Sequence, residues 1–190
     1  PVMVLGDGTI GQMMEPVVVK EVTPKTYDNS WAAVGWEDKS RPRAVINSLS
    51  LDPNKLEKMN DHLQEKYRII EEKEVLWETY NAEDCDILIV AFGTTARSAR
   101  SVINEYTIPN HKVGLFCPLT VWPFPYKQLK EAAKGKKAVL VAEMNAGQMI
   151  DDVRLALGDS VPIHFYGRTG GVITGVEELY DNVKKIGEVL

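Results

Sequence analysis

Residues 86–95 read DILIVAFGTT and form the basis for predicting the fold class. The first half of this stretch is a continuous apolar run, and a strand without polar alternation is buried on both faces of a sheet. The glycine and threonines that follow are typical of a turn into a helix. The stretch therefore predicts one strand–helix unit of an α/β domain.

The same unit recurs three more times toward the C-terminus, with short links between strand and helix. Further strands are predicted at 112–117 (KVGLFC), 137–142 (KAVLVA) and 162–166, and helices at 96–106, at 126–133, up to about Leu157 and at 176–189. Such repetition produces right-handed crossovers and a parallel sheet covered on both sides. Residues 84–190 are therefore predicted to form a three-layer α/β/α domain with a mainly parallel sheet.

The chain before residue 84 lacks this rhythm. Residues 2–5 (VMVL) predict a strand that enters a sheet whose other strands are mostly missing, and 9–15 predict a short helix that Pro16 stops. Residues 17–44 show no period, which predicts a connecting segment. Natural chain ends are usually loose and polar. This chain opens with PVMVL and no methionine, so we expect an excised piece of a longer subunit.

A long helix is predicted to follow the connecting segment. Asp52 is a carboxylate N-cap and Pro53 suits the first helical position. The helix is expected to run to about Tyr80, with an apolar residue at every seventh position: Leu56, Leu63, Ile70 and Trp77. A coiled coil and an amphipathic helix lying on a domain both fit this pattern. The absence of a clean second apolar column favours the second interpretation.

Composition excludes several classes of protein. The net charge of −5 argues against nucleic acid, because phosphate binding requires a clustered basic surface. No apolar run approaches the roughly 20 residues of a membrane span, and no signal peptide opens the chain, so we expect a cytoplasmic location away from membranes.

The cysteines and histidines predict no metal centre. Cys85 and Cys117 are too few for a disulfide framework or an iron–sulfur cluster, so we expect two reduced thiols, at least one of them buried. His62, His111 and His164 are scattered without metal-ligand spacing. We therefore predict no metal site.

Residues 6–11 (GDGTIG) match the G-x-G-x-x-G pattern of dinucleotide-binding turns. That site requires a full crossover helix and a carboxylate about 20 residues further on, but Pro16 interrupts the helix. The start of a magnesium–thiamine diphosphate motif is a second interpretation, with Asp7 as a metal ligand. Its asparagine pair is missing, because Asn29 comes too early and Asn47 too late. A tight turn that requires small residues is the third interpretation and fits best.

Three polar turns follow the predicted parallel strands, at 93–95, 143–148 and 167–171. Open α/β sheets bind ligands along this edge, where helix N-termini present free N–H groups. The candidate ligand or interface residues are Thr94, Thr95, Glu143, Asn145, Gln148, Arg168 and Thr169. Arg168 could hold a carboxylate or phosphate, or pair with Glu143. Helix capping by Thr94 or Thr95 together with a subunit contact is the favoured alternative.

No arrangement of nucleophile, base or paired carboxylates stands out. We therefore assign no catalytic and no cofactor-binding residue.

Five blocks, in this order along the chain, resemble the alpha subunit of 2-oxoacid:ferredoxin oxidoreductases. The blocks are PVMVLGDGTIGQMMEPV (1–17), VAFGTTARSARSVI (90–103), KVGLFCPLTVWPFP (112–125), LVAEMNAGQMIDDVRLAL (140–157) and FYGRTGG (165–171). The 2-oxoisovalerate type is the most similar, with the 2-oxoglutarate type close behind. The order of the blocks disfavours another transketolase-like enzyme, such as a pyruvate dehydrogenase beta chain.

The resemblance implies a division of the chain into three parts. Residues 1–20 would be the tail of a pyrimidine-binding domain, 21–83 a connector with a long amphipathic helix, and 84–190 a transketolase C-terminal-like domain. In the family, the cofactor-activating glutamate and the residues that bind the 2-oxoacid lie upstream of residue 1. The resemblance therefore transfers no catalytic residue to this chain.

The implied reaction belongs to the full complex. It is the oxidative decarboxylation of a 2-oxoacid to acyl-CoA with reduction of ferredoxin, and it uses thiamine diphosphate, magnesium and iron–sulfur clusters. The implied partners are beta, gamma or ferredoxin-like subunits, with ferredoxin and coenzyme A. This chain is expected to hold no cofactor, to be inactive alone and to serve assembly in an oligomer. A free-standing nucleotide- or phosphate-binding α/β module is the alternative.

Overall fold

A computed structural model describes residues 2–33, residue 35 and residues 42–190. The chain divides into two compact units. One unit consists of the N-terminal residues up to Met13 together with Arg68–Leu190, and the other is Met14–Tyr67. The candidate residues all lie in the first unit, which we call the α/β unit.

A five-stranded sheet forms the centre of the α/β unit. The strands are β1 (Trp77–Tyr80), β2 (Ile87–Val90), β3 (Val113–Pro118), β4 (Ala138–Glu143) and β5 (Ile163–Gly167), in the order β1-β3-β2-β4-β5. The four predicted strands run parallel, and β1 pairs antiparallel with β3. The mainly parallel sheet expected from the sequence is confirmed.

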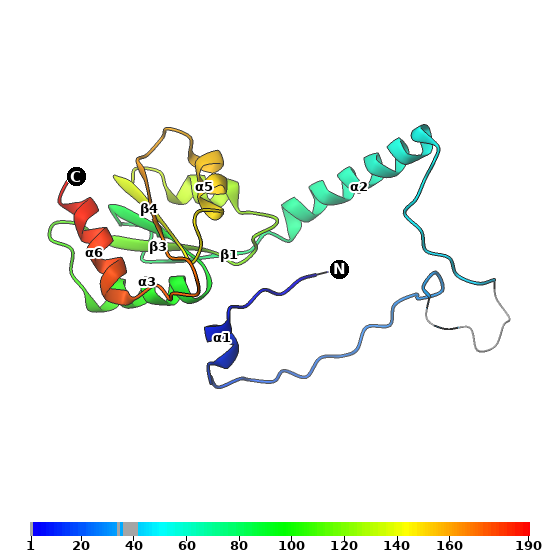
Figure 1. Cartoon of the computed structure of the whole chain (residues 1–190), viewed down its shortest axis with the longest axis horizontal. Helices are drawn as coiled ribbons and strands as arrows, with labels where there is room; N and C mark the ends of the chain where they lie inside the picture. Colours follow the sequence, from blue (N-terminus) through cyan, green and yellow to red (C-terminus); the bar gives the residue numbers. More distant parts are fainter. Residues whose placement is uncertain (1, 34, 36–41) are drawn as a thin grey trace. The chain divides into compact units, whose positions relative to one another are not determined.

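Helices cover both faces of this sheet. Helices α3 (Gly93–Glu105) and α6 (Val176–Gly187) pack together on one face, and α4 (Tyr126–Ala132) and α5 (Met149–Leu157) pack on the other (Figure 1). Successive residues of β2 point to opposite faces, so Ile87 and Ile89 join the core under α3 and α6, while Leu88 joins the other core. All four residues of β2 are buried. The predicted three-layer architecture is therefore confirmed.

The long helix α2 ends earlier than the heptad spacing predicted. It spans Pro53–Lys73 and begins where expected, because the Asp52 carboxylate accepts a hydrogen bond from the N–H of Asn54 at 3.0 Å. The expected extension to Tyr80 is wrong. Trp77 matches the heptad stripe, but its backbone instead pairs with Pro118 as the first residue of β1. Pairing with β3 outweighs the local helical pattern here.

The segment before the connecting region forms a short helix but no strand. Helix α1 (Gly8–Gln12) overlaps the predicted range 9–15 but begins one residue earlier and ends three residues earlier. Residues 2–5 are exposed and pair with no strand among the described residues, so the predicted strand is not formed here. Within the described part of the chain, no helix combines the length and apolar character that crossing a membrane requires.

Candidate functional site at the carboxyl edge of the sheet

The three polar turns lie at the carboxyl ends of β2, β4 and β5, on the same edge of the parallel sheet. Thr94 and Thr95 are buried in the first turn of α3, and Glu143 is the buried last residue of β4. Asn145 and Arg168 are half-buried, and Gln148 and Thr169 are exposed. Their hydrogen bonds decide what each can do.

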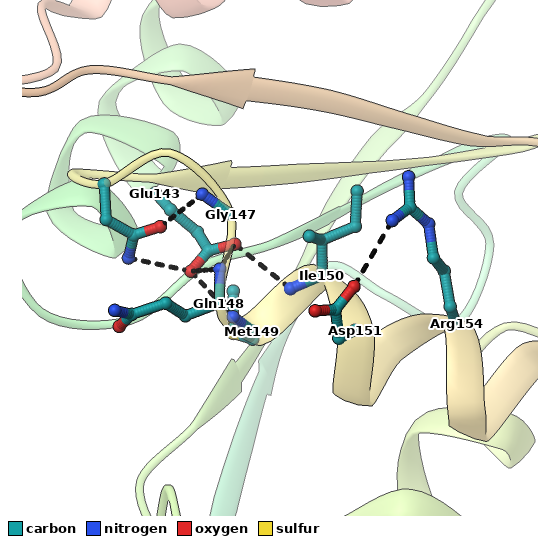
Figure 2. A network of polar contacts seen from close by, with 8 residues as sticks. Glu143, Gly147, Gln148, Met149, Ile150, Asp151 and Arg154 are labelled. Carbon is teal, nitrogen blue, oxygen red and sulfur yellow. Dashed lines mark hydrogen bonds and ion pairs between the residues drawn. The ribbon is translucent and has the colours of Figure 1, made fainter.

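The Glu143 carboxylate caps helix α5 (Figure 2). Its Oε2 accepts a hydrogen bond from the N–H of Met149 at 2.8 Å, and its Oε1 accepts one from the N–H of Ile150 at 3.1 Å. The N–H of Gln148 lies 3.3 Å from both oxygens. These are the N–H groups that the first turn of a helix leaves without an intrahelical partner. A carboxylate from the preceding strand thus takes the place of an N-cap side chain.

This carboxylate has little capacity left for a ligand. Oε2 also accepts a hydrogen bond from the side-chain amide of Asn145 at 2.9 Å, and only 2% of Glu143 is exposed. Burying a charge is costly unless hydrogen bonds replace its hydration. The three backbone N–H groups, the amide and the positive end of α5 supply that replacement. The arrangement makes Glu143 a structural anchor of α5.

The turns after β4 and β5 pack closely against each other, and Asn145 and two glycines make this possible. The Oδ1 of Asn145 accepts a hydrogen bond from the N–H of Gly147 at 2.7 Å, and Gly147 has a φ of 109°, which favours glycine. A Cβ on Gly167 would clash with the carbonyl oxygen of Asn145. Glu143 also accepts a backbone hydrogen bond from Arg168 at 3.0 Å. The blocks EMNAGQM and FYGRTGG therefore pack tightly against each other.

Arg168 does not pair with Glu143, contrary to the hypothesis from the sequence. Its guanidinium lies 3.2 Å from Oε1 of Glu178 in α6, and the Tyr166 hydroxyl donates to Oε2 of the same carboxylate at 2.7 Å. Glu143 is buried and already saturated, whereas Glu178 is at the surface and can reach the guanidinium. Burial and the bond to Glu178 raise the pKa of Tyr166. Arg168 therefore stabilises the contact between β5 and α6.

Neither Thr94 nor Thr95 is the N-cap of α3, so the predicted capping by these residues is wrong. The helix begins at Gly93, and its N-cap residue is Phe92, whose side chain makes no capping bond within the described part of the chain. Sequence reasoning missed Asp7 as a neighbour of this turn. A Cβ on Gly93 would lie 3.8 Å from Oδ2 of Asp7. No local signal links two segments so far apart in the chain.

The two thiols are poorly suited to nucleophilic chemistry. Cys85 and Cys117 are both buried, as expected for at least one of them. Burial raises the pKa of Cys85, and burial together with the nearby Glu78 raises the pKa of Cys117 to about 11. A thiol with such a pKa stays protonated near neutral pH, and the thiolate is the reactive form.

The described residues also do not fit a magnesium–thiamine diphosphate group. No set of three or more histidine, cysteine, aspartate or glutamate side chains among them could hold a metal ion. Asp7 instead caps α1, because its Oδ1 accepts a hydrogen bond from the N–H of Ile10 at 2.8 Å.

Comparison with known proteins identifies the family. Residues 85–179, half of the chain, match the family model of the pyruvate:ferredoxin oxidoreductase core domain II. The chain belongs to this family. The match runs from the start of the predicted α/β domain into α6.

Relatives of known name extend the likeness to the whole chain. It is 37% identical to the ketoisovalerate oxidoreductase subunit VorB of Methanothermobacter marburgensis over 190 residues, which are all of this chain and 52% of the relative. The VorB of Methanothermobacter thermautotrophicus is 38% identical over the same share. The chain thus spans about half the length of these curated relatives. The resemblance to 2-oxoacid:ferredoxin oxidoreductase subunits is confirmed.

A solved structure shows the same fold. The 2-oxoglutarate:ferredoxin oxidoreductase from Magnetococcus marinus, with 2-oxoglutarate, coenzyme A and succinyl-CoA bound, matches with a TM-score of 0.63 at 23% identity. The match covers 73% of this chain and 24% of that one. This likeness supports the fold described for the α/β unit.

Proposed function

We propose that this chain forms part of the alpha subunit of a cytoplasmic, thiamine diphosphate-dependent 2-oxoacid:ferredoxin oxidoreductase and serves subunit assembly rather than catalysis. Residues 1–20 would be the tail of the pyrimidine-binding domain, 21–83 the connector and 84–190 a transketolase C-terminal-like domain. Thiamine diphosphate, magnesium and iron–sulfur clusters would belong to other parts of the complex. Its beta, gamma or ferredoxin-like subunits would be the partners, and ferredoxin and coenzyme A would serve the complex.

An exposed apolar surface on a fixed loop carries this proposal. We call it the edge patch, and its members are between 41% and 56% exposed: Leu76, Trp77, Leu119, Val121 and Trp122. Such a concentration of large apolar side chains on a soluble domain marks an interaction surface. Tryptophan is also among the residues that contribute most to binding at protein interfaces.

Hydrogen bonds hold the edge patch in one conformation. The hydroxyl of Thr120 accepts a bond from the N–H of Leu76 at 3.0 Å and lies 2.7 Å from the carbonyl oxygen of Pro123. The N–H of Leu119 donates to the carbonyl oxygen of Leu76 at 3.0 Å. A surface that is ordered before binding loses less entropy when a partner docks. This supports a protein partner for the edge patch.

Two charged side chains at the carboxyl edge, one buried and one half-buried, support a role outside catalysis. Glu143 is used to cap α5, and Arg168 is used to pair with Glu178. A catalytic acid or base requires a free position for a substrate proton within hydrogen-bond reach. These two groups bind other parts of the same chain instead.

Co-purification with the other subunits of the complex tests the proposal. The double variant Leu119→Ser with Trp122→Ser should weaken the binding of this chain to its partner subunits by about 30-fold or more, because the loss of even one interface anchor costs about 2 kcal/mol or more. Leu155→Ser is the matched control, since Leu155 is a 74% exposed leucine on α5 and is not a member of the edge patch. Equal binding of all three forms, with unchanged thermal unfolding, would refute the assembly role of the edge patch.

A further inference from the structure

Among the described residues, the N-terminus of helix α3 has no side-chain capping bond and its first turn has no acidic residue. Its N-cap is Phe92, and its first turn contains glycine and threonine but no aspartate or glutamate. The first N–H groups of a helix have no intrahelical partner, and the helix dipole makes this end positive. The N-terminus of α3 is therefore suited to a negative group supplied from elsewhere.

The side chain of Thr94 indicates where that group lies. Thr94 is only 7% exposed, and its hydroxyl has no hydrogen-bond partner of regular geometry among the described residues. The Asp7 carboxylate is close enough to interact with this hydroxyl. A buried hydroxyl without a partner is unfavourable. The position of Asp7 explains why this one is tolerated.

Asp7 brings a carboxylate to this turn. Gly93 has a φ of 60°, and a Cβ built on it would lie 3.8 Å from Oδ2 of Asp7 and 3.6 Å from Cδ1 of Ile10. Oδ1 of Asp7 is occupied by the N–H of Ile10, so Oδ2 is the oxygen closer to α3. The Ile10 N–H and then the hydroxyl and N–H of Thr94 lower the pKa of Asp7, so the carboxylate stays charged.

We propose that the Asp7 carboxylate binds the N-terminus of α3 and thereby docks residues 6–12 against this helix. Residues 92–95 form an anion-binding turn, and the anion that fills it is part of the same chain. This inference goes beyond the proposed function and does not depend on the reaction of the complex. It also assigns a use to the GDGTIG motif, which matches neither a dinucleotide site nor a magnesium site.

The docking depends on one charge. Residues 2–13 contain a single ionised side chain, that of Asp7. Exposed apolar residues precede it, with Val2 and Val4 more than 90% exposed. Docking by Asp7 therefore fixes one end of this apolar segment beside α3.

The variant Asp7→Asn separates the two tasks of this side chain. Asparagine is as good an N-cap as aspartate, so α1 keeps its bond to Ile10. The charge that faces α3 is lost. Asp28→Asn is the matched control, because Asp28 also accepts a local backbone bond, from the N–H of Ser30 at 2.9 Å, but lies outside the α/β unit.

Amide hydrogen exchange of the full chain, measured by NMR, tests the proposal. In Asp7→Asn, the N–H groups of Thr94 and Thr95 should exchange about 2- to 5-fold faster, as expected for the loss of a charge at a helix terminus. Asp28→Asn should leave these rates unchanged. Inorganic phosphate should slow the exchange in Asp7→Asn and not in the wild type, because only the variant has an open anion-binding turn.

Three results would overturn the proposal. Equal exchange in the wild type and Asp7→Asn would show that the carboxylate does not bind α3. Phosphate protection of Thr94 and Thr95 in the wild type would show that Asp7 leaves the turn open. Failure of phosphate to protect the variant would show that the turn does not bind anions. None of these measurements involves a partner subunit, so they are independent of the assembly test.

Discussion

Replacing Glu143 by glutamine tests whether this carboxylate holds α5 in place. Both oxygens accept backbone N–H bonds from the first turn of α5, at 2.8 and 3.1 Å. Glutamine keeps the shape of the side chain but has one oxygen and one NH₂ group. In either orientation, a donor then faces a donor, and the negative charge at the positive end of the helix is lost.

The expected loss of unfolding free energy is about 3 kcal/mol. Removing a favourable, buried charge from a helix terminus costs about 1–2 kcal/mol, and leaving one buried N–H without a partner costs about 1–3 kcal/mol. For a chain of this length, a loss of that size lowers the thermal midpoint by about 6–12 °C. Urea unfolding followed by circular dichroism at 222 nm measures it.

Asp151→Asn is the control for this variant. Asp151 also lies in the first turn of α5, but it is exposed, and its one ion pair among the described residues is with Arg154, at 3.3 Å (Figure 2). Exposed pairs of this kind contribute about 0.5 kcal/mol or less. If Glu143→Gln destabilises the protein no more than Asp151→Asn does, the carboxylate is not the anchor of α5.

Three further predictions follow from single groups. The pKa of Asp86 is lowered, mainly by the hydrogen bond from the N–H of Lys112. The ionised carboxylate therefore stabilises the fold at pH values above its unfolded pKa. This stabilisation is lost as the pH falls through the lower pKa of the folded state. Asp86→Asn should therefore be less stable at pH 6 and show a shallower loss of stability below about pH 4; parallel acid-unfolding curves would contradict this. Gly167→Ala should lower the free energy of unfolding by about 1–3 kcal/mol, because the added Cβ would clash with a backbone oxygen. Gly11→Ala should lower it far less, because a Cβ on Gly11 would meet open space. Similar urea midpoints for the two variants would contradict the steric argument. Cys117, buried and with a pKa of about 11, should react with a thiol reagent at pH 8 only after unfolding, and rapid labelling of the native chain would contradict its burial.

The parallel part of the sheet could be predicted because its signal is local. Each central strand is a short apolar run that is followed by a turn and a helix, as in residues 86–95. Strand β1 could not be found in this way. Trp77 continues a heptad spacing, and only the backbone of β3, which is distant in sequence, makes its segment a strand.

The candidate site could be located from the sequence, but its use could not. Glu143 and Arg168 are polar residues at strand ends, so their position at the carboxyl edge followed from the order of strands. Their partners depend on three-dimensional distances: Glu143 reaches forward to α5, and Arg168 reaches Glu178 on α6. Asp7 has no local signal for its approach to the turn before α3, because the two segments are joined only by the fold.

Thermal unfolding with added ligand tests the central claim most directly, namely that this chain supports assembly and holds no cofactor. Thiamine diphosphate with magnesium should leave the midpoint of the full chain unchanged, and so should NAD, ATP and coenzyme A, which a free-standing nucleotide-binding module would recognise. A ligand at about 100 times its Kd stabilises a protein by about 2.7 kcal/mol. If thiamine diphosphate and magnesium raised the thermal midpoint by an amount that corresponds to this stabilisation, a cofactor site would lie on this chain and the proposed assembly role would be contradicted.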